Sequence, residues 1–391
     1  MNESAFKQLL TSILNGRSLF GFIWNFFINF LPVFIWILIF KNAGLIPKRI
    51  RPPINVKLPM ILDNYIFNIN ESLFTSILAL IIFVFISYLL YINFYRFSND
   101  SNGIIQQHCQ LLNADLENVE QQKLSKMCRS YNHWHSSPPL LLCFSWFILN
   151  FVYELREPIS ITKDLIAWFS YVLCHVAAPI LTAIWLYIFH PPGALKLFSF
   201  ALGIQNIAGV LTHLLFPNAP PWFIHYYGEN HEANYDILGY AAGLVRVDIA
   251  LGTYMHTKGF HISPIVFGAI PSIHSSTATL VFFFVSYYAR WICLKVVVLG
   301  FVILQWWATI YLDHHWRIDL MIGLMYSIVS FTFLTCWKYG LHKIDADFLE
   351  AQLKLDFQKG SSMAMRVFKK TRFQNFFDPF FPYLFFSLRS H

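Results

Sequence analysis

The stretch "PSIHSSTATLVFFFVSYYARWICLKVVVLGFVILQWWATIYLDHHWRID", residues 271–319, contains two apolar runs that meet at a short basic corner. Each run approaches the length of roughly 20 apolar residues that a bilayer core requires. The corner from Arg290 to Lys295 predicts a turn, so the two runs form an antiparallel helical hairpin. Such a hairpin brings His315 back to the membrane face of His274, although the two residues lie far apart in the sequence.

A carboxylate accompanies the second of these histidines. Asp319 follows His315 by four residues, which places both side chains on one face if a helix begins there. A carboxylate beside an imidazole fixes its tautomer and stabilises the cation that forms during reaction. A lone histidine at a helix end is usually an interfacial residue. Three such groups on one face instead predict phosphoryl transfer, with one imidazole as nucleophile and the other as acid and base.

The composition predicts an all-α integral membrane protein. Of the 391 residues, 56% are hydrophobic and only 13% are charged, whereas soluble proteins average about 25% charged residues. The net charge of +7 lies in short clusters that flank apolar runs, which favours cytosolic loops and anionic headgroups over nucleic acid. We expect about eight transmembrane helices, near residues 20–40, 72–93, 139–155, 165–189, 194–216, 275–293, 295–312 and 318–337.

The loops between these helices divide the chain into three expected regions. Residues 1–160 form an N-terminal membrane region with a basic loop (41–71) and a polar loop (96–137). Residues 161–340 form the catalytic membrane core, and 341–391 form a basic cytosolic tail. The six cysteines show neither a CxxC pair nor metal-ligand spacing, so the sequence indicates no metal site and no disulfide framework. No cofactor motif is present.

The positive-inside rule orients these helices. Lys196, the Arg290–Lys295 corner and the basic tail belong in the cytosol, which places the loops 41–71, 217–267 and 313–317 on the opposite, luminal face. The basic loop disobeys this rule, because it carries "PKRIRPP" at residues 47–53. Either the number of preceding helices differs from this count, or these charges serve an anionic ligand.

The motif "PSIH" followed by "HHWRID" resembles the lipid phosphate phosphatase and phosphotransferase (PAP2) superfamily. Longer stretches, among them "RIRPPINVKLP", "FPNAPPWF" and "SPIVFGAIPSIHS", are similar to the fungal sphingolipid branch, the inositolphosphotransferases and inositol phosphorylceramide synthases. This resemblance implies a PAP2-like helical core in which His315 is the nucleophile, Asp319 its partner and His274 the acid and base.

The chain departs from the superfamily pattern where phosphate is usually held. Ala308 and Thr309 replace the expected Ser-Arg pair, and Ile273 replaces a glycine. The phosphate must therefore take its positive charge from other residues. The candidates are Arg51, Arg246, Lys258 and Arg317, with hydroxyl donors from Ser272 and Ser275. Headgroup contacts for the cations and helix capping for the serines are the alternatives.

The resemblance also implies an activity. We expect a multi-pass Golgi enzyme with a luminal active site, which moves inositol phosphate from phosphatidylinositol to mannosyl-inositol-phosphorylceramide and releases diacylglycerol. The alternatives are ceramide as acceptor, a lipid phosphatase that uses water, or a lipid-binding protein with an inactive site. The expected partners are the two lipid substrates and membrane lipids, and the need for an accessory subunit stays open.

Overall fold

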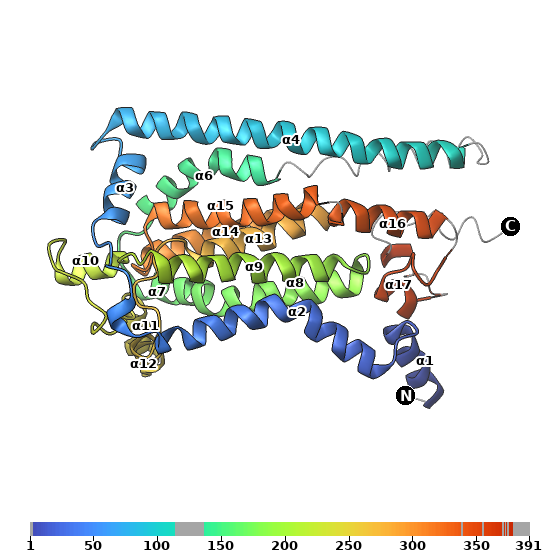
Figure 1. Cartoon of the computed structure of the whole chain (residues 1–391), viewed down its shortest axis with the longest axis horizontal. Coiled ribbons are helices and arrows are strands. Elements are labelled where there is room, and N and C mark those ends of the chain that lie inside the picture. The colour runs from blue at the N-terminus through green and yellow to red at the C-terminus, as the bar shows by residue number, and fades with distance from the viewer. Residues whose placement is uncertain are drawn as a thin grey trace.

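The computed structural model describes residues 3–113, 137–337, 339–353, 356–369, 371, 373 and 375–377. Long helices lie side by side along one axis of the molecule, as Figure 1 shows. They are α2 (Leu19–Asn42), α4 (Leu73–Asn113), α6 (Ser137–Glu154), α8 (His175–Phe189), α9 (Ala194–Leu215), α13 (Ile273–Tyr288), α14 (Ile292–Tyr311) and α15 (Arg317–Cys336). Helix α7 (Ile161–Trp168) continues into α8 through a π-helical segment, Phe169–Cys174.

Short helices close the two ends of this bundle. At one end lie α3 (Leu58–Phe67), α10 (Pro221–Tyr227), α11 (Leu244–Leu251) and α12 (Met255–His261), and at the other lie α1 (Glu3–Leu14), α16 (Leu341–Leu353) and α17 (Met363–Val367) (Figure 1). Three-residue 3-10 turns occur at Ala43–Leu45, Lys48–Ile50 and Asn375–Phe377. In the described part of the chain, β-structure is confined to isolated bridges that join Asn55, Asn218 and Gly268.

Six helical segments of the described chain are long and apolar enough to cross a membrane. They are Leu9–Leu45, Leu73–Phe94, Ile161–Phe189, Ala194–Leu215, Ile292–Tyr311 and Arg317–Thr335. This confirms a multi-pass, helical membrane protein. The predicted segments 139–155 and 275–293 also form helices, α6 and α13, but neither is among these six.

Helix α13 is the centre of the bundle, because residues 275–286 are all buried. It packs between α14 and α15, which are the helices that position the histidine–carboxylate motif. Hydroxyl groups connect the three helices. Ser275 accepts a hydrogen bond from Trp306 of α14 at 2.8 Å and donates one to the Leu320 carbonyl of α15 at 2.7 Å. Such interhelical bonds and small side chains replace the hydrophobic effect, which does not join helices within lipid.

Helix α2 joins the bundle through a close contact with α9. Pro32 interrupts the α2 hydrogen-bond ladder, and Figure 1 shows the bend in this helix. Gly203 of α9 lies against Pro32, where an added Cβ would stand only 2.4 Å from the proline Cβ. Ser199, one turn earlier, donates to the Asn29 carbonyl at 2.7 Å. The absence of a side chain at Gly203 therefore lets the two backbones approach.

The segments that were predicted as loops contain short helices as well as turns. Residues of the segments 41–71, 217–267 and 313–317 meet at one end of the bundle, as the hairpin arrangement predicts. The Asn55 carbonyl accepts from Ala219 N at 3.0 Å, and the Asp313 carbonyl accepts from Trp222 N at 3.1 Å. The polar loop at 96–137 is wrong in its first part, since α4 continues as a helix to Asn113. Polar residues do not end a helix whose apolar part is already formed. Residues 114–136 lie outside the described residues.

Candidate active site

The turn after α14 orients the histidine pair. His314 N donates to the Thr309 carbonyl at 3.0 Å, and Asp313 N donates to the Ile310 carbonyl at 3.0 Å. This is the hydrogen-bond pattern of a Schellman motif, in which the residue after the C-cap adopts the left-handed conformation. Asp313 takes that position with φ of +65°. The helix therefore ends sharply, and the chain reverses direction at His314 and His315.

Asp319 contacts His315, as their spacing predicts. Its Oδ2 lies 3.3 Å from His315 Nδ1 and accepts from Trp316 N at 2.9 Å. Helix α15 begins at Arg317, so His315 lies just before the helix and Asp319 lies in its first turn. The His315 side chain is 9% exposed and that of Asp319 is fully buried. With Nδ1 directed at the carboxylate, the proton belongs on Nδ1 and the Nε2 lone pair remains for a substrate.

His274 comes to the same place from the start of α13. Ser272 caps this helix, and its Oγ accepts from Ser275 N at 3.3 Å. Ser272 N donates to the Asp319 carbonyl at 3.0 Å, so the two motifs are bonded directly. Gly323 makes this contact possible, because an added Cβ would stand 2.4 Å from the Ser272 carbonyl oxygen. The rings of His274 and His315 lie 5.8 Å apart between centroids.

Aromatic rings hold His274 and His314 in a stack. Tyr171 stacks on His274 at 4.1 Å and on His314 at 5.0 Å, and Phe260 covers the other face of His314 at 4.8 Å. His175 packs against His274 at 4.2 Å. Tyr171 lies within the π-helical segment and His175 directly follows it, and such segments occur frequently at functional sites. Burial lowers the pKa of His314 to about 3, so this imidazole is neutral at physiological pH.

These histidines line a cavity of about 160 Å³, which we call the histidine pocket. Its polar lining includes His213, His274, His314, His315 and Ser263, and the rest of its lining is largely aromatic and aliphatic. Among the described residues that line it there is no lysine or arginine. His213 is fixed by its Nε2, which lies 2.8 Å from the Pro271 carbonyl oxygen. The pocket therefore offers several imidazoles but no permanent positive charge.

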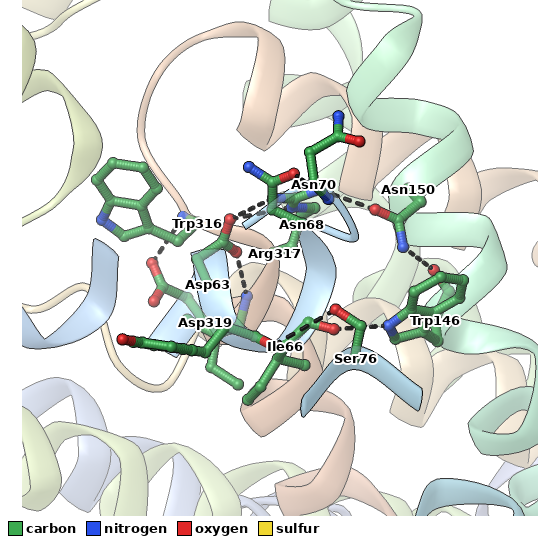
Figure 2. Close-up of polar contacts among 12 residues, drawn as sticks. Asp63, Ile66, Asn68, Asn70, Ser76, Trp146, Asn150, Trp316, Arg317 and Asp319 are labelled. Atoms are coloured by element: carbon green, nitrogen blue, oxygen red, sulfur yellow. Dashed lines mark hydrogen bonds and ion pairs between the residues drawn. The ribbon is translucent and has the colours of Figure 1, made fainter. Parts of the chain in front are cut away.

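A second carboxylate fixes the start of α15 from outside, as Figure 2 shows. Asp63 of α3 accepts from Ile318 N at 3.1 Å through Oδ1, and from Arg317 Nη2 at 2.7 Å and Nε at 3.0 Å through Oδ2. Asn150 of α6 accepts from Arg317 Nη1 at 2.8 Å. Asp63 and Arg317 are both buried. A carboxylate at a helix N-terminus satisfies an N–H that has no partner within the helix.

The structure brings together only part of the predicted site. His274, His315 and Asp319 meet, and Ser272 lies beside them. Arg317 is instead bonded to Asp63 and Asn150, and Arg246 is bonded to Asp164 at 2.7 Å. The Ser275 hydroxyl group is already hydrogen-bonded to Trp306 of α14 and to the Leu320 carbonyl of α15. Lys258 is exposed on α12, and Arg51 lines a neighbouring cavity.

Sequence reasoning missed several residues of the site. Tyr171 and His213 lie within apolar runs, where nothing in the sequence separates them from core residues. His175 also lies within an apolar run, and its Nδ1 is buried without a hydrogen-bond partner among the described residues while its ring packs on His274. For Asp63, the sequence signal is weak, because it is one of two acidic residues, with Glu71, in an otherwise basic loop.

A helical bundle that joins a capped "PSIH" helix to a His-x-x-x-Asp turn defines a PAP2-type site, and the PAP2 superfamily model matches residues 139–333. Within this superfamily the chain belongs to the inositolphosphotransferase family. It is 32% identical to Inositolphosphotransferase 1 of Saccharomyces cerevisiae over 95% of this chain and 98% of that protein.

Other relatives match over less than half of this chain. The inositol phosphorylceramide synthase of Candida albicans is 40% identical over 45% of this chain and 36% of that protein. The catalytic subunit of the Schizosaccharomyces pombe synthase is 39% identical over 44% of this chain and 40% of that protein. No solved structure matches this chain significantly.

Proposed function

We propose that this protein transfers inositol phosphate from phosphatidylinositol to mannosyl-inositol-phosphorylceramide. The observation that carries this proposal is the contact between His315 and Asp319 at 3.3 Å, with the His274 ring facing the same pocket. The similarity over nearly the whole chain to a protein named inositolphosphotransferase supports the group that is transferred. The acceptor follows from the sequence resemblance.

In the first step, His315 Nε2 attacks the phosphorus of phosphatidylinositol. The P–N bond forms while the P–O bond to diacylglycerol breaks, and His274 gives a proton to the departing oxygen. Asp319 accepts the Nδ1–H bond throughout and stabilises the positive charge that His315 gains. His274 carries this proton at the start of each cycle, because it takes one from the acceptor hydroxyl at the end of the previous cycle.

In the second step, an acceptor hydroxyl attacks the same phosphorus from the pocket. His274 is neutral after the first step and removes the hydroxyl proton, while the P–N bond breaks and His315 is regenerated. The net reaction exchanges one phosphate ester for another, so it needs no oxidant and no nucleotide. The Ser272 hydroxyl group is a further candidate donor to the phosphate oxygens, because it caps α13 one residue away from Ile273 at the pocket wall.

The arrangement in the membrane belongs to the same proposal. Residues 161–340 form the catalytic core, with α6 and α13 completing eight membrane helices around it. The end that carries α3 and α10–α12 faces the Golgi lumen, and the 341–391 tail faces the cytosol. Thiol labelling of an Arg49→Cys variant, with the six native cysteines replaced by serine, in sealed Golgi vesicles tests this orientation. Labelling by an impermeant reagent only after permeabilisation supports it, and labelling of intact vesicles contradicts it.

The activity is tested with membranes that contain the full chain and phosphatidylinositol labelled in its inositol. The labelled product is separated after incubation with mannosyl-inositol-phosphorylceramide, with ceramide, or with no acceptor. We expect a labelled sphingolipid only with the mannosylated acceptor, and none with the His315→Ala variant. Transfer to ceramide would instead define an inositol phosphorylceramide synthase. Release of water-soluble inositol phosphate as the main product would define a phosphatase.

A further inference from the structure

A second cavity, of about 190 Å³, adjoins the histidine pocket at the same end of the bundle. The two share His213, Ser263, Ile265 and Val266 in their linings. The second cavity is closed on its other side by the segment after α2, through Gly44, Lys48 and Arg51. We call it the basic cavity, and its polar lining consists of Lys48, Arg51, His213, Tyr235, His261 and Ser263.

The charges that line the two cavities differ. The basic cavity is lined by two cations and two imidazoles, and no aspartate or glutamate is among the described residues of its lining. Lys48 forms an ion pair with Asp236, but both side chains are largely exposed, and exposed pairs contribute little. Positive charge is therefore concentrated beside the histidine pocket and not within it.

Arg51 is oriented before any ligand binds. Its Nε donates to the Ile46 carbonyl at 3.0 Å, and its Nη2 donates to the Ala43 and Gly44 carbonyls at 3.3 Å each. Its guanidinium lies 5.1 Å from the centre of the Tyr235 ring. These partners are neutral, and Nη1 has no protein acceptor in the described chain. A fixed cation without a carboxylate partner binds an anion at a low ordering cost.

We propose that the basic cavity binds the phosphodiester that the sphingolipid acceptor already carries. This inference rests on the proposed function. The phosphate in transfer must lie at His315, so an anion in the basic cavity is a second one. An acceptor that presents a sugar hydroxyl at the histidine pocket and its own phosphodiester nearby fits this pair of cavities. Ceramide has no anion to place there, so the basic cavity selects an anionic acceptor.

The test measures the KM of each substrate separately, with full-length enzyme in membranes. Arg51→Gln is expected to raise the KM for mannosyl-inositol-phosphorylceramide by about tenfold or more, the effect of one lost hydrogen bond to a charged group. The KM for phosphatidylinositol and kcat are expected to stay unchanged. Arg51→Lys should recover part of the loss, because it keeps the charge but not the planar fork.

Matched variants separate binding from folding. Lys48→Gln should raise the acceptor KM in the same way, and the Lys48 side chain is bonded to Asp236 and to no backbone atom of the described chain. Asp236→Asn removes the same ion pair but keeps the cation, so it should leave the acceptor KM unchanged or lower it. Arg49 lies on the same segment, is exposed and does not line the cavity, and Arg49→Gln should have no effect.

Two results would overturn this assignment while the transfer reaction stands. One is an increase in the KM for phosphatidylinositol and not in the KM for the acceptor. This would mean that the basic cavity binds the donor or another anionic lipid. The other is an unchanged acceptor KM in both Arg51→Gln and Lys48→Gln. Failure of the proposed function itself would appear earlier, as absence of transfer to the mannosylated acceptor by the unmodified enzyme.

Discussion

In the described part of the chain, His315 and His256 each contact a buried aspartate, and the two pairs differ in what the second imidazole nitrogen contacts. In one pair, His315 Nδ1 lies 3.3 Å from Asp319, and in the other, His256 Nδ1 lies 2.7 Å from Asp248. The second pair is the shorter one. His256 Nε2, however, accepts a hydrogen bond from Trp168 Nε1 at 3.0 Å, whereas His315 lines the histidine pocket and its Nε2 has no partner in the described chain.

The carboxylates differ as well. Burial opposes ionisation of Asp248, but hydrogen bonds from Thr257 and His256 outweigh it and hold the pKa of this carboxyl well below its ordinary value. Thr253 donates a further hydrogen bond at 2.9 Å. The His256–Asp248 pair therefore has hydrogen-bond partners at both imidazole nitrogens and at both carboxylate oxygens. It connects α12 to α11 and, through Trp168, to α7. A short hydrogen bond between an imidazole and a carboxylate therefore does not by itself indicate a reactive site. An imidazole nitrogen that faces a cavity and has no hydrogen-bond partner does indicate one.

The largest expected effect separates these two imidazoles. His315→Ala should reduce kcat to background, because loss of a nucleophile from a catalytic triad lowers kcat by roughly 10⁶-fold. His256→Ala should leave kcat unchanged and lower thermal stability, since it leaves Asp248 and Trp168 without their partner. This comparison fails if a correctly folded His256→Ala variant has lost its activity, or if the His315→Ala variant has kept its activity.

The next effect concerns the two carboxylates. Asp319→Asn should lower kcat by about 10²–10⁴-fold, because the imidazole stays in place but loses the charge that fixes its tautomer and stabilises its cation. Asp248→Asn should instead lower the unfolding temperature and spare kcat. Steady-state kinetics and thermal unfolding of both variants give the answer, and equal losses of kcat would remove the distinction drawn between the pairs.

A smaller effect is expected for Asp63, which acts on the reactive pair through α15. Asp63→Asn should lower kcat about tenfold at unchanged KM, and it should destabilise the fold because an unpaired buried charge at Arg317 typically costs about 3–5 kcal/mol. The double variant Asp63→Asn with Arg317→Met removes both charges. It should regain thermal stability but not kcat, since an asparagine oxygen can still accept from Ile318 N but the negative charge at the start of α15 is lost. Recovery of both would make Asp63 purely structural.

The smallest effect belongs to an exposed pair at the same turn. His225 Nδ1 lies 2.8 Å from Asp313, and this hydrogen bond raises the pKa of His225. The stabilisation is fully present below the ordinary pKa of about 6.5 and is lost as pH rises through the raised value. Wild type should therefore unfold at a higher temperature than Asp313→Asn at about pH 6, with the difference gone near pH 9. A difference that is independent of pH would contradict this.

The sequence predicted the parts of the fold that follow from local chemistry. Apolar runs gave the helices, the Arg290–Lys295 corner gave the hairpin, and the i, i+4 spacing gave the contact between His315 and Asp319. It did not predict the Schellman turn at Asp313, because glycine is the usual residue at that position and aspartate rarely takes it. The sequence also did not predict that α4 continues as a helix past residue 95, since polar composition does not distinguish a loop from a solvated helix.

Long-range partners could not be predicted for a different reason. A sequence states which cations exist but not which carboxylates they meet, so Arg317 and Arg246 were expected at a phosphate and are instead bonded to Asp63 and Asp164. Likewise, Tyr171 lies in a π-helical segment, which the sequence does not predict, and from there its ring stacks on His274 of α13. Such contacts depend on how helices distant in sequence pack together.

The bond between Asp63 and Arg317 also bears on how these enzymes can be recombined. The superfamily model begins at residue 139, whereas the carboxylate that fixes the start of α15 comes from residue 63, outside the matched segment. A chimera that grafts residues 139–333 onto the N-terminal half of another transferase would keep the buried Arg317 but take its acidic partner from the other protein. The N-terminal half therefore does more than hold the protein in the membrane. An active chimera should take Asp63 and the turn before α15 from the same protein.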